Sequence, residues 1–327
     1  MQRRPFLQSA AAALATSISW PGLVHAADWP SRLIKIVVPF GPGGVADVTA
    51  RIVGKTLAEQ LHQSVIIENR PGAGGVVAGE LVARAGPDGY TLLLMSNGTA
   101  VSEGLFKHLP FDAQKDFAPI STLGFFDIAI VVPANSRFKT LADLLTFARA
   151  NPDKLNLGSI NVGSTQNLAA QLFKTTAGIH AQIVPFNGTG AVLTALRSGQ
   201  LDAGVEVLSP VMSQIRGGVL HALAVLGEKR SPDLPQVPTV RESGGSLASF
   251  NVASWNALAA PAKTPSAVLQ RLNHEVDVAL KSPDVIRSLT QINVQPRAGT
   301  PAQLADLLGS EIQRWGSVIK SAGIPQQ

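Results

Sequence analysis

The fold class of this chain is decided by the stretch Leu33-Ile34-Lys35-Ile36-Val37-Val38-Pro39-Phe40-Gly41-Pro42-Gly43-Gly44. Its apolar, β-branched first half is ended by Pro39 and predicts a buried strand, and the glycines that follow predict a turn. Apolar residues then recur at steps of three to five positions from Val45 to Leu61. This spacing predicts a helix that starts near Asp47. The segment is therefore a strand–loop–helix unit.

The same unit recurs twice in the next fifty residues. Residues 65–67 predict a strand, residues 70–75 form a second glycine-rich loop, and residues 76–85 predict a helix. A third strand over residues 91–95 ends in the polar loop Ser96–Thr99. Three such units in succession imply a mostly parallel sheet with right-handed crossovers.

A second alternating series follows the apolar run at residues 125–132. Helices are expected over residues 140–150, in a segment that begins at about residue 165, in another that ends at residue 198, and over residues 210–216. Strands are expected over residues 155–158, 182–184 and 203–205. A linker-like stretch over 234–246 precedes a strand at 252–258. Each of the three closing helices is marked by a hydroxyl residue before a proline, at Thr264-Pro265, Ser282-Pro283 and Thr300-Pro301.

Two α/β lobes joined by two crossing strands explain this order of elements. We expect the first lobe to comprise residues 27–125 and 248–327, and the second lobe residues 126–247. The ligand site is expected in the cleft between the lobes. A hinge near Phe126 and Phe250 is expected to close it.

The composition excludes several classes of protein. The chain has 327 residues, of which 45% are hydrophobic and 15% charged, so it can bury a core and is not disordered. It has no cysteine, which excludes disulfides, a thiol nucleophile and Cys-ligated metal sites. The net charge of +5 comes from dispersed basic residues, so we expect no nucleic-acid partner.

Residues 1–26 have the features of an export signal. Arg3-Arg4 precedes the apolar stretch Phe6–Trp20, and Val24-His25-Ala26 is a small-residue cleavage signal. The arginine pair also fits a twin-arginine signal, which would mean export after folding. We expect cleavage after Ala26 and a periplasmic protein.

One motif points to an alternative class, a dinucleotide-binding oxidoreductase. Gly41–Ala46 satisfies G-x-G-x-x-A after a strand, and Glu68 closes the next strand. Against it, Asp47 would place a negative charge near the pyrophosphate. The sequence has no G-x-S-x-G nucleophile elbow and no H-E-x-x-H zinc motif, and the histidines after the signal are isolated from one another. We therefore predict a protein that is not an enzyme and has no cofactor.

Four loops at the carboxyl ends of predicted strands share one composition. Each is rich in Gly, Ser, Thr or Asn and runs into a helix; the loops are 40–44, 96–99, 159–165 and 186–190. Free backbone N–H groups and the helix dipole can hold a carboxylate there, and open α/β sheets bind ligands at this edge. None of the four contains Lys or Arg, so we expect hydrogen bonds rather than an ion pair to hold the anion.

Motifs along the whole chain resemble the Bug, or TctC-type, periplasmic receptors of tripartite tricarboxylate transporters. They are Val37–Gly44 with Asp47 and Arg51, Glu68–Gly75, Pro87–Leu92, Leu109–Asp112 with Lys115–Pro119, Lys229–Pro232, and Val237–Val240 with Glu242–Gly244. The resemblance implies a periplasmic-binding-protein-like fold that closes on a small organic acid and presents it to integral membrane transporter subunits. A monomer is expected. A ligand sensor that feeds a signalling partner is an alternative with the same sequence features.

Several motifs depart from the family pattern, at Gly98–Gly104, Ser159–Asn167 and Pro185–Gly188, and Glu206 stands where an aspartate is common. We therefore expect a family-like carboxylate cradle around a different distal half of the ligand. Asp47 is expected to face the ligand through water or an amine. The candidate ligand-binding residues are Phe40, Gly41, Asp47, Ser96, Asn97, Thr99, Ser159, Asn161, Gly163, Ser164, Thr165, Phe186 and Glu206.

Overall fold

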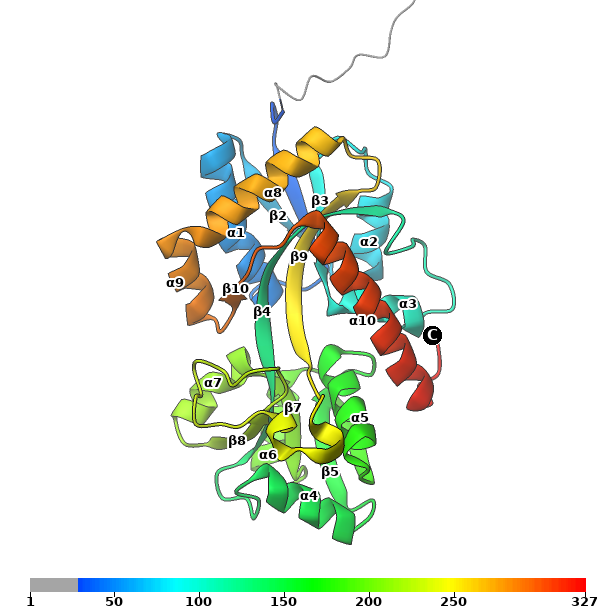
Figure 1. Cartoon of the computed structure of the whole chain (residues 1–327), viewed down its shortest axis with the longest axis vertical. Helices are drawn as coiled ribbons and strands as arrows, with labels where there is room; N and C mark the ends of the chain where they lie inside the picture. Colours follow the sequence, from blue (N-terminus) through cyan, green and yellow to red (C-terminus); the bar gives the residue numbers. More distant parts are fainter. Residues whose placement is uncertain (1–28) are drawn as a thin grey trace, which may run out of the picture.

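The described chain forms one continuous sheet of ten strands, and this sheet extends through both halves of the protein. The computed structural model describes residues 29–327, so the predicted export signal lies outside this part. The strand order is β2-β1-β3-β9-β4-β7-β5-β6, and β8 and β10 also pair with β4. Helices cover the sheet in two lobes arranged along the long axis (Figure 1). The predicted α/β fold of two lobes joined by crossing strands is confirmed.

The first lobe combines the early and late parts of the described chain, which lie together at the top of Figure 1. Strand β1 pairs in parallel with β2 and β3, and β3 pairs antiparallel with β9. The elements are β1 (Ile34–Val38), α1 (Val45–Leu61), β2 (Val65–Asn69), η2 (Ala73–Gly75), α2 (Val76–Ala83), β3 (Thr91–Ser96), α3 (Asn97–Leu105), α8 (Ser266–Lys281), α9 (Pro283–Gln291), β10 (Gln295–Pro296) and α10 (Pro301–Ser321).

The second lobe repeats the parallel winding around β5, which pairs with β6 on one side and β7 on the other. The elements are α4 (Leu141–Ala150), β5 (Leu155–Ile160), α5 (Thr165–Ala177), β6 (Ala181–Phe186), α6 (Thr189–Arg197), β7 (Ala203–Val207), α7 (Leu208–Arg216), β8 (Leu220–Val225), η3 (Val240–Ser243) and η4 (Gly245–Leu247).

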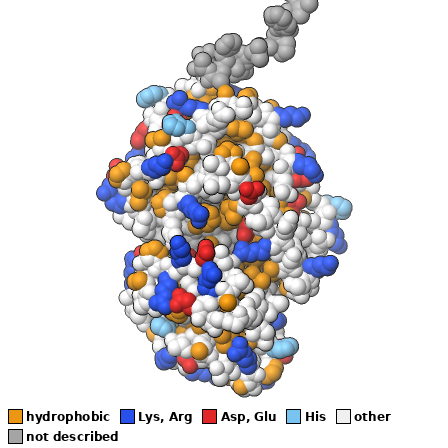
Figure 2. Space-filling model, in the orientation of Figure 1, with side chains coloured by type: hydrophobic (Ala, Val, Ile, Leu, Met, Phe, Trp, Pro, Cys, Tyr) orange, Lys and Arg blue, Asp and Glu red, His pale blue; other side chains and the backbone are white. Residues whose placement is uncertain are grey.

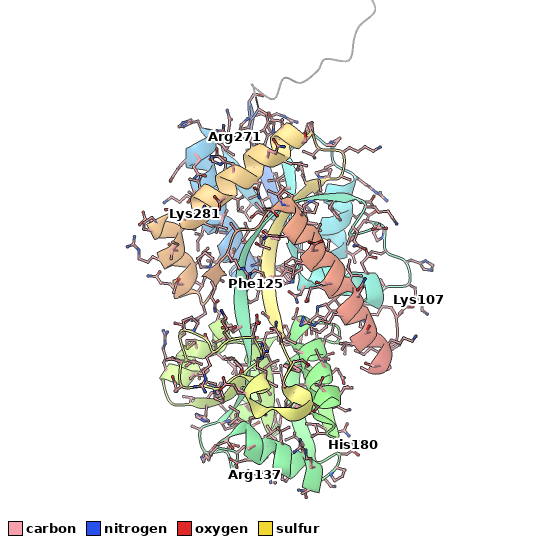
Figure 3. The ribbon with its side chains drawn as sticks, in the orientation of Figure 1. Lys107, Phe125, Arg137, His180, Arg271 and Lys281 are labelled. Atoms are coloured by element: carbon pink, nitrogen blue, oxygen red, sulfur yellow. The ribbon has the colours of Figure 1, made fainter. Side chains whose placement is uncertain are left out.

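Two long strands, β4 (Phe117–Pro133) and β9 (Ala253–Pro261), connect the lobes. Strand β4 pairs with β9 up to Asp127 and with β7 and β8 from Ile128 onward. Phe125 therefore lies at the waist of the molecule, as Figure 3 shows. The lobe boundaries predicted at residues 125/126 and 247/248 stay a prediction.

Strand β4 is buried on both faces beyond the waist. Ile128, Ile130 and Val132 belong to the main hydrophobic core, whereas Ala129 and Val131 belong to a smaller core of the second lobe. Successive side chains of a strand point to opposite faces, so one apolar run supplies both cores. This burial on both faces explains why the sequence at residues 128–132 is continuously apolar.

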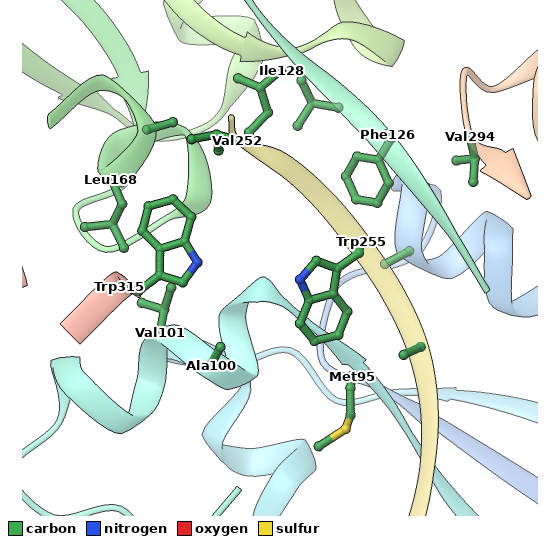
Figure 4. Packing of buried hydrophobic residues seen from close by; sticks show 14 of the residues in the cluster. Met95, Ala100, Val101, Phe126, Ile128, Leu168, Val252, Trp255, Val294 and Trp315 are labelled. Carbon is green, nitrogen blue, oxygen red and sulfur yellow. The ribbon is translucent and has the colours of Figure 1, made fainter. Parts of the chain in front are cut away.

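The main core also joins the lobes through α10. Trp315 of α10 is fully buried, and Figure 4 shows it beside Val101 of α3 and Leu168 of α5. Its indole Nε1 donates a 2.7 Å hydrogen bond to Glu311. Glu311 also accepts a 2.7 Å bond from Arg314, so this buried carboxylate is paired. Helix α10 thus holds elements of both lobes against the crossing strands.

Some local predictions need correction. Ser96–Thr99 is not a free loop: Ser96 ends β3 and caps α3, which begins at Asn97. The short polar sequence hid this helix because its capping box has Ser and Thr rather than Ser and Glu. Strands β8 and β10 were not predicted. Of the three hydroxyl caps expected for the closing helices, only Thr300 accepts a hydrogen bond from the first turn of its helix, whereas Thr264 donates to the Pro261 carbonyl.

Candidate functional site

A cavity of about 630 Å³ lies between the lobes. Both lobes and both crossing strands contribute to its wall. The lining residues are Phe40, Gly44, Val45, Ala46, Gly72, Gly74, Gly75, Ser96, Gly98, Leu105, Phe106, Phe126, Ile160, Asn161, Val162, Gly163, Ser164, Thr165, Gln166, Val207, Pro210, Ser254, Asn256 and Gln327. Of the thirteen predicted site residues, Phe40, Ser96, Asn161, Gly163, Ser164 and Thr165 are in this set.

The first wall is the start of α1. Gly44 is its N-cap and has an extended backbone with no side-chain cap. The first intrahelical bond runs from the Val48 N–H to the Gly44 carbonyl, so the N–H groups of Val45, Ala46 and Asp47 have no intrahelical acceptor. Val45 and Ala46 line the cavity. This helix start can therefore donate to an anion in the cavity.

Asp47 supports this wall but is absent from the cavity lining. Its carboxylate accepts hydrogen bonds from the Gly43 N–H at 2.8 Å, from Arg51 at 3.0 Å and from Asn69 at 2.8 Å. Burial raises the pKa of Asp47, but these three partners outweigh it and hold the pKa below its ordinary value. The side chain fixes the loop at residues 40–44, and its predicted contact with the ligand stays untested. Gly41 also lies outside the lining.

Asp47→Asn is expected to lower the free energy of unfolding at pH 7 by about 1–2 kcal/mol, because charge-assisted hydrogen bonds are lost. Since the pKa of Asp47 is lowered in the folded state, this difference should shrink as the pH falls below about 4. Urea unfolding at several pH values measures it. The exposed pair Asp277–Lys281 gives a control, Asp277→Asn, which should change stability by under about 0.5 kcal/mol. A larger effect in the control would contradict the assignment.

The second glycine-rich loop forms the next part of the wall and was missed as a site. Gly74 and Gly75 have φ values of +60° and +75°, which favour glycine. A Cβ at Gly74 would lie 2.6 Å from the Phe106 ring, so the backbone approaches closely there. The signal was present in the sequence, because residues 72–75 repeat the composition of the loop at 41–44.

Ser96 lines the cavity, whereas its neighbours Asn97 and Thr99 are turned away. The Ser96 hydroxyl accepts from the Gly98 N–H at 3.1 Å, and Thr99 Oγ1 accepts from the Ser96 N–H at 3.3 Å. Asn97 is fully buried; its Oδ1 accepts from the Trp255 N–H at 3.1 Å and its Nδ2 donates to Glu311 at 3.3 Å. Asn97 therefore ties the cavity wall to β9 and α10.

The second lobe contributes the start of α5. Ser164 is its N-cap: its hydroxyl accepts from the Asn167 N–H at 3.1 Å and donates to the Ile160 carbonyl at 2.8 Å. Thr165 follows in the first turn and lines the cavity. Ser159 is fully buried and accepts a 3.0 Å bond from Asn167, so it shapes the loop without lining it.

Glu206 and Phe186 lie outside the lining, although both were predicted in the site. Glu206 is fully buried at the end of β7, where Thr189 Oγ1 donates to its Oε2 at 2.8 Å. Burial raises the pKa of Glu206 to about 7, and the hydrogen bond from Thr189 lowers it only in part. Gln166 lines the cavity, and Glu206 lies next to Gln166 on the side away from the cavity.

The crossing strands supply lining residues that sequence analysis missed: Phe126 from β4 and Ser254 and Asn256 from β9. Strand pairing sets Phe126 opposite Ser254, and Asn256 opposite Ser96. Their only sequence signal is a polar residue within an otherwise apolar strand, at Ser254 and Asn256.

The wall has no ionised side chain: among the described residues that line the cavity, none is Asp, Glu, Lys, Arg or His. Arg70, the nearest loop cation in sequence, pairs with Glu68 at 2.5 Å outside the lining. Glu68, the acid of the dinucleotide fingerprint, also pairs with Lys35 at 2.6 Å. Across residues 29–327, no cluster of His, Asp and Glu could hold a metal ion. No helix in that range is long and apolar enough to cross a membrane.

Most charged side chains lie on the outside of the molecule, and the buried carboxylates Asp47, Glu206 and Glu311 are not among the lining residues. On the face in Figure 2, Lys and Arg are spread over both lobes with Asp and Glu among them. The groups that can hydrogen-bond a ligand in the cavity are therefore backbone N–H groups, hydroxyls and amides, within a largely apolar wall.

Comparisons with known proteins show which family the chain is similar to. The family described as tripartite tricarboxylate transporter family receptor matches residues 49–324. A protein of the UPF0065 group from a Pseudomonas species, in the tcbD-tcbE intergenic region, is 37% identical over 97% of this chain and 94% of its own. Rpa4515 of R. palustris with adipate is 32% identical, with a TM-score of 0.80 over 92% of this chain and all of that one. MatC of Rhodopseudomonas palustris with bound malate is 34% identical, with a TM-score of 0.76 over 89% and 100%.

Proposed function

Because the chain belongs to the tripartite tricarboxylate transporter receptor family, we propose that it is a periplasmic receptor for a small organic carboxylate. It delivers this ligand to the integral membrane subunits of a tripartite tricarboxylate-type transporter. The observation that carries the proposal is the cavity itself: helix starts from both lobes face one space whose described lining has no charged side chain. Such a space suits an anion held by dipoles.

The strength of such a site is sufficient for a transport receptor. A hydrogen bond to a charged acceptor contributes roughly 1.5–3 kcal/mol, so three or four of them give about micromolar binding after the cost of association. Solved relatives hold adipate and malate, which are small carboxylates. These support the class of ligand proposed for this chain.

Closure of the lobes completes the site. Phe40 is 39% exposed on the rim of the first lobe and Val162 is 46% exposed on the rim of the second. Both line the cavity, so a movement that brings the rims together buries apolar surface as well as the ligand. The two crossings near Phe126 and Phe250 are the segments about which the lobes move.

A thermal-shift screen against small mono- and dicarboxylates tests the proposal, because a ligand that binds only the folded state raises the melting midpoint. Calorimetry then gives the affinity of each hit, and small-angle scattering with and without it reports closure. If no carboxylate in the screen raised the melting midpoint, the assignment of a carboxylate ligand would be wrong. A fluorescence titration with reduced nicotinamide dinucleotide tests the oxidoreductase alternative in the same preparation.

Ser164→Ala is expected to weaken carboxylate binding about tenfold, because the start of α5 loses the cap that orients its free N–H groups. Thr140→Ala is the matched control: Thr140 caps α4, which contributes no lining residue, so this variant should lose stability but keep its affinity. Arg70→Gln should also bind normally. Loss of all binding in Arg70→Gln, with Ser164→Ala unaffected, would show that a cation holds the anion.

A further inference from the structure

Asn256 is the one lining residue whose side chain is fully buried with both polar atoms lacking a hydrogen-bond partner in the described chain. It lies on β9, between Ser96 of β3 and Gly124 of β4. Ser254, two positions before it on the same face of the strand, also lines the cavity. Asn256 is therefore at the floor of the cavity, where the crossing strands meet the first lobe.

The contrast with Asn97 shows what is unusual. Asn97 is equally buried, but Trp255, Glu311 and the Ala253 carbonyl satisfy its amide. An unpaired buried polar group costs roughly 1–3 kcal/mol. The residues after Asn256 are Ala257 and Leu258, and a leucine at 256 would fill a similar volume without this cost. A polar side chain kept there calls for a partner that the protein chain does not supply.

We propose that Asn256 determines specificity by hydrogen-bonding the end of the ligand that is not the anchoring carboxylate. This deepens the proposed function and rests on it. An amide presents one donor group and one acceptor side by side, so it is fully satisfied by a group that also both donates and accepts. A hydroxyl and a carboxamide do so. A second carboxylate only accepts, which leaves the Asn256 oxygen facing negative charge.

The rest of the wall agrees with this class of ligand. Leu105, Phe106, Phe126, Ile160 and Val207 surround the space with apolar surface, and no cation in the described lining could balance a second carboxylate. A buried charge without a partner is disfavoured. The preferred ligand is therefore a monocarboxylate with an apolar body and a hydroxyl or carboxamide at its other end. Since the amide is covered from solvent, we expect opening of the lobes along β4 and β9 to admit that end.

A matched series tests the inference by calorimetry. The thermal-shift screen sets the number of carbon atoms in the probes. For six carbons, the four probes are hexanoate, 6-hydroxyhexanoate, 6-amino-6-oxohexanoate and adipate. The protein should bind the hydroxyl or carboxamide probe at least about tenfold more tightly than hexanoate and adipate. Asn256→Leu should abolish this preference while its melting midpoint stays equal or rises. Asn251→Leu, an exposed position before β9, is the control and should keep the preference.

Two outcomes would overturn the inference while leaving the proposed function intact. One is binding of carboxylate probes with no preference among the four ends. The other is a preference that survives in Asn256→Leu. Failure of every carboxylate in the screen would instead remove the proposed function, and with it the specificity assigned to Asn256.

Discussion

Glu206→Gln is expected to raise the free energy of unfolding by roughly 3–4 kcal/mol at pH 8 and by only about 1 kcal/mol at pH 5. The fully buried carboxyl has its pKa raised to about 7, because burial penalises the charged form. In the unfolded chain a glutamate titrates near 4.3. Between these two values the folded protein holds a proton that the unfolded chain has lost, so stability falls as the pH rises. Above about pH 7 the full penalty is present.

Glutamine removes this dependence because it keeps the shape of the side chain and cannot ionise. Thr189, which hydrogen-bonds Glu206, and Gln166 beside it are both neutral and do not titrate with it. Urea unfolding of the protein and of the variant at pH 5, 6, 7 and 8 gives the difference directly. Glu59→Gln, an exposed position on α1, is the control and should follow the unmodified protein at each pH. A difference that is flat with pH would contradict the raised pKa.

Gly163→Ala is expected to weaken carboxylate binding about a hundredfold. Gly163 lies at the start of α5 with φ +81°, and a Cβ there would be 2.5 Å from Leu105 Cδ2 of the opposite lobe. Leu105 is only 4% exposed, so it has little room to move away. The added methyl group should hold the lobes apart and reduce the contacts that the ligand gains on closure. A hundredfold loss corresponds to about 2.8 kcal/mol.

Two variants separate closure from backbone strain. Gly178→Ala has a similar positive φ of +61° at a helix end with open space around it, so it should lose stability but bind normally. Leu105→Ala on the Gly163→Ala background should recover part of the affinity, because it makes room for the methyl group. Scattering curves should show a smaller change on ligand addition for Gly163→Ala than for the unmodified protein. Normal affinity in Gly163→Ala would rule out this close approach as part of binding.

The candidate site was predictable where one segment of chain carries both the element and its chemistry. The loop at residues 159–165 is such a case, because the strand, the polar turn and the cap Ser164 are consecutive. Asp47 shows the limit. Its place in the first turn of α1 is a local property, but its partner Asn69 arrives from the neighbouring strand β2. The sequence therefore indicated Asp47 as a candidate but could not indicate its hydrogen bond with Asn69.

The sequence by itself determined the alternation of strands and helices, the crossing of the chain between two lobes, and the loops that start α1 and α5. These depend on hydrophobic periodicity and on caps, which act over a few residues. The tertiary structure alone decided which side chains meet. It placed Asn256 next to Ser96 through β9 pairing, buried Glu206 behind Gln166, and brought Gly163 against Leu105. Such contacts join residues far apart in the chain, and their energies depend on burial that no local pattern encodes.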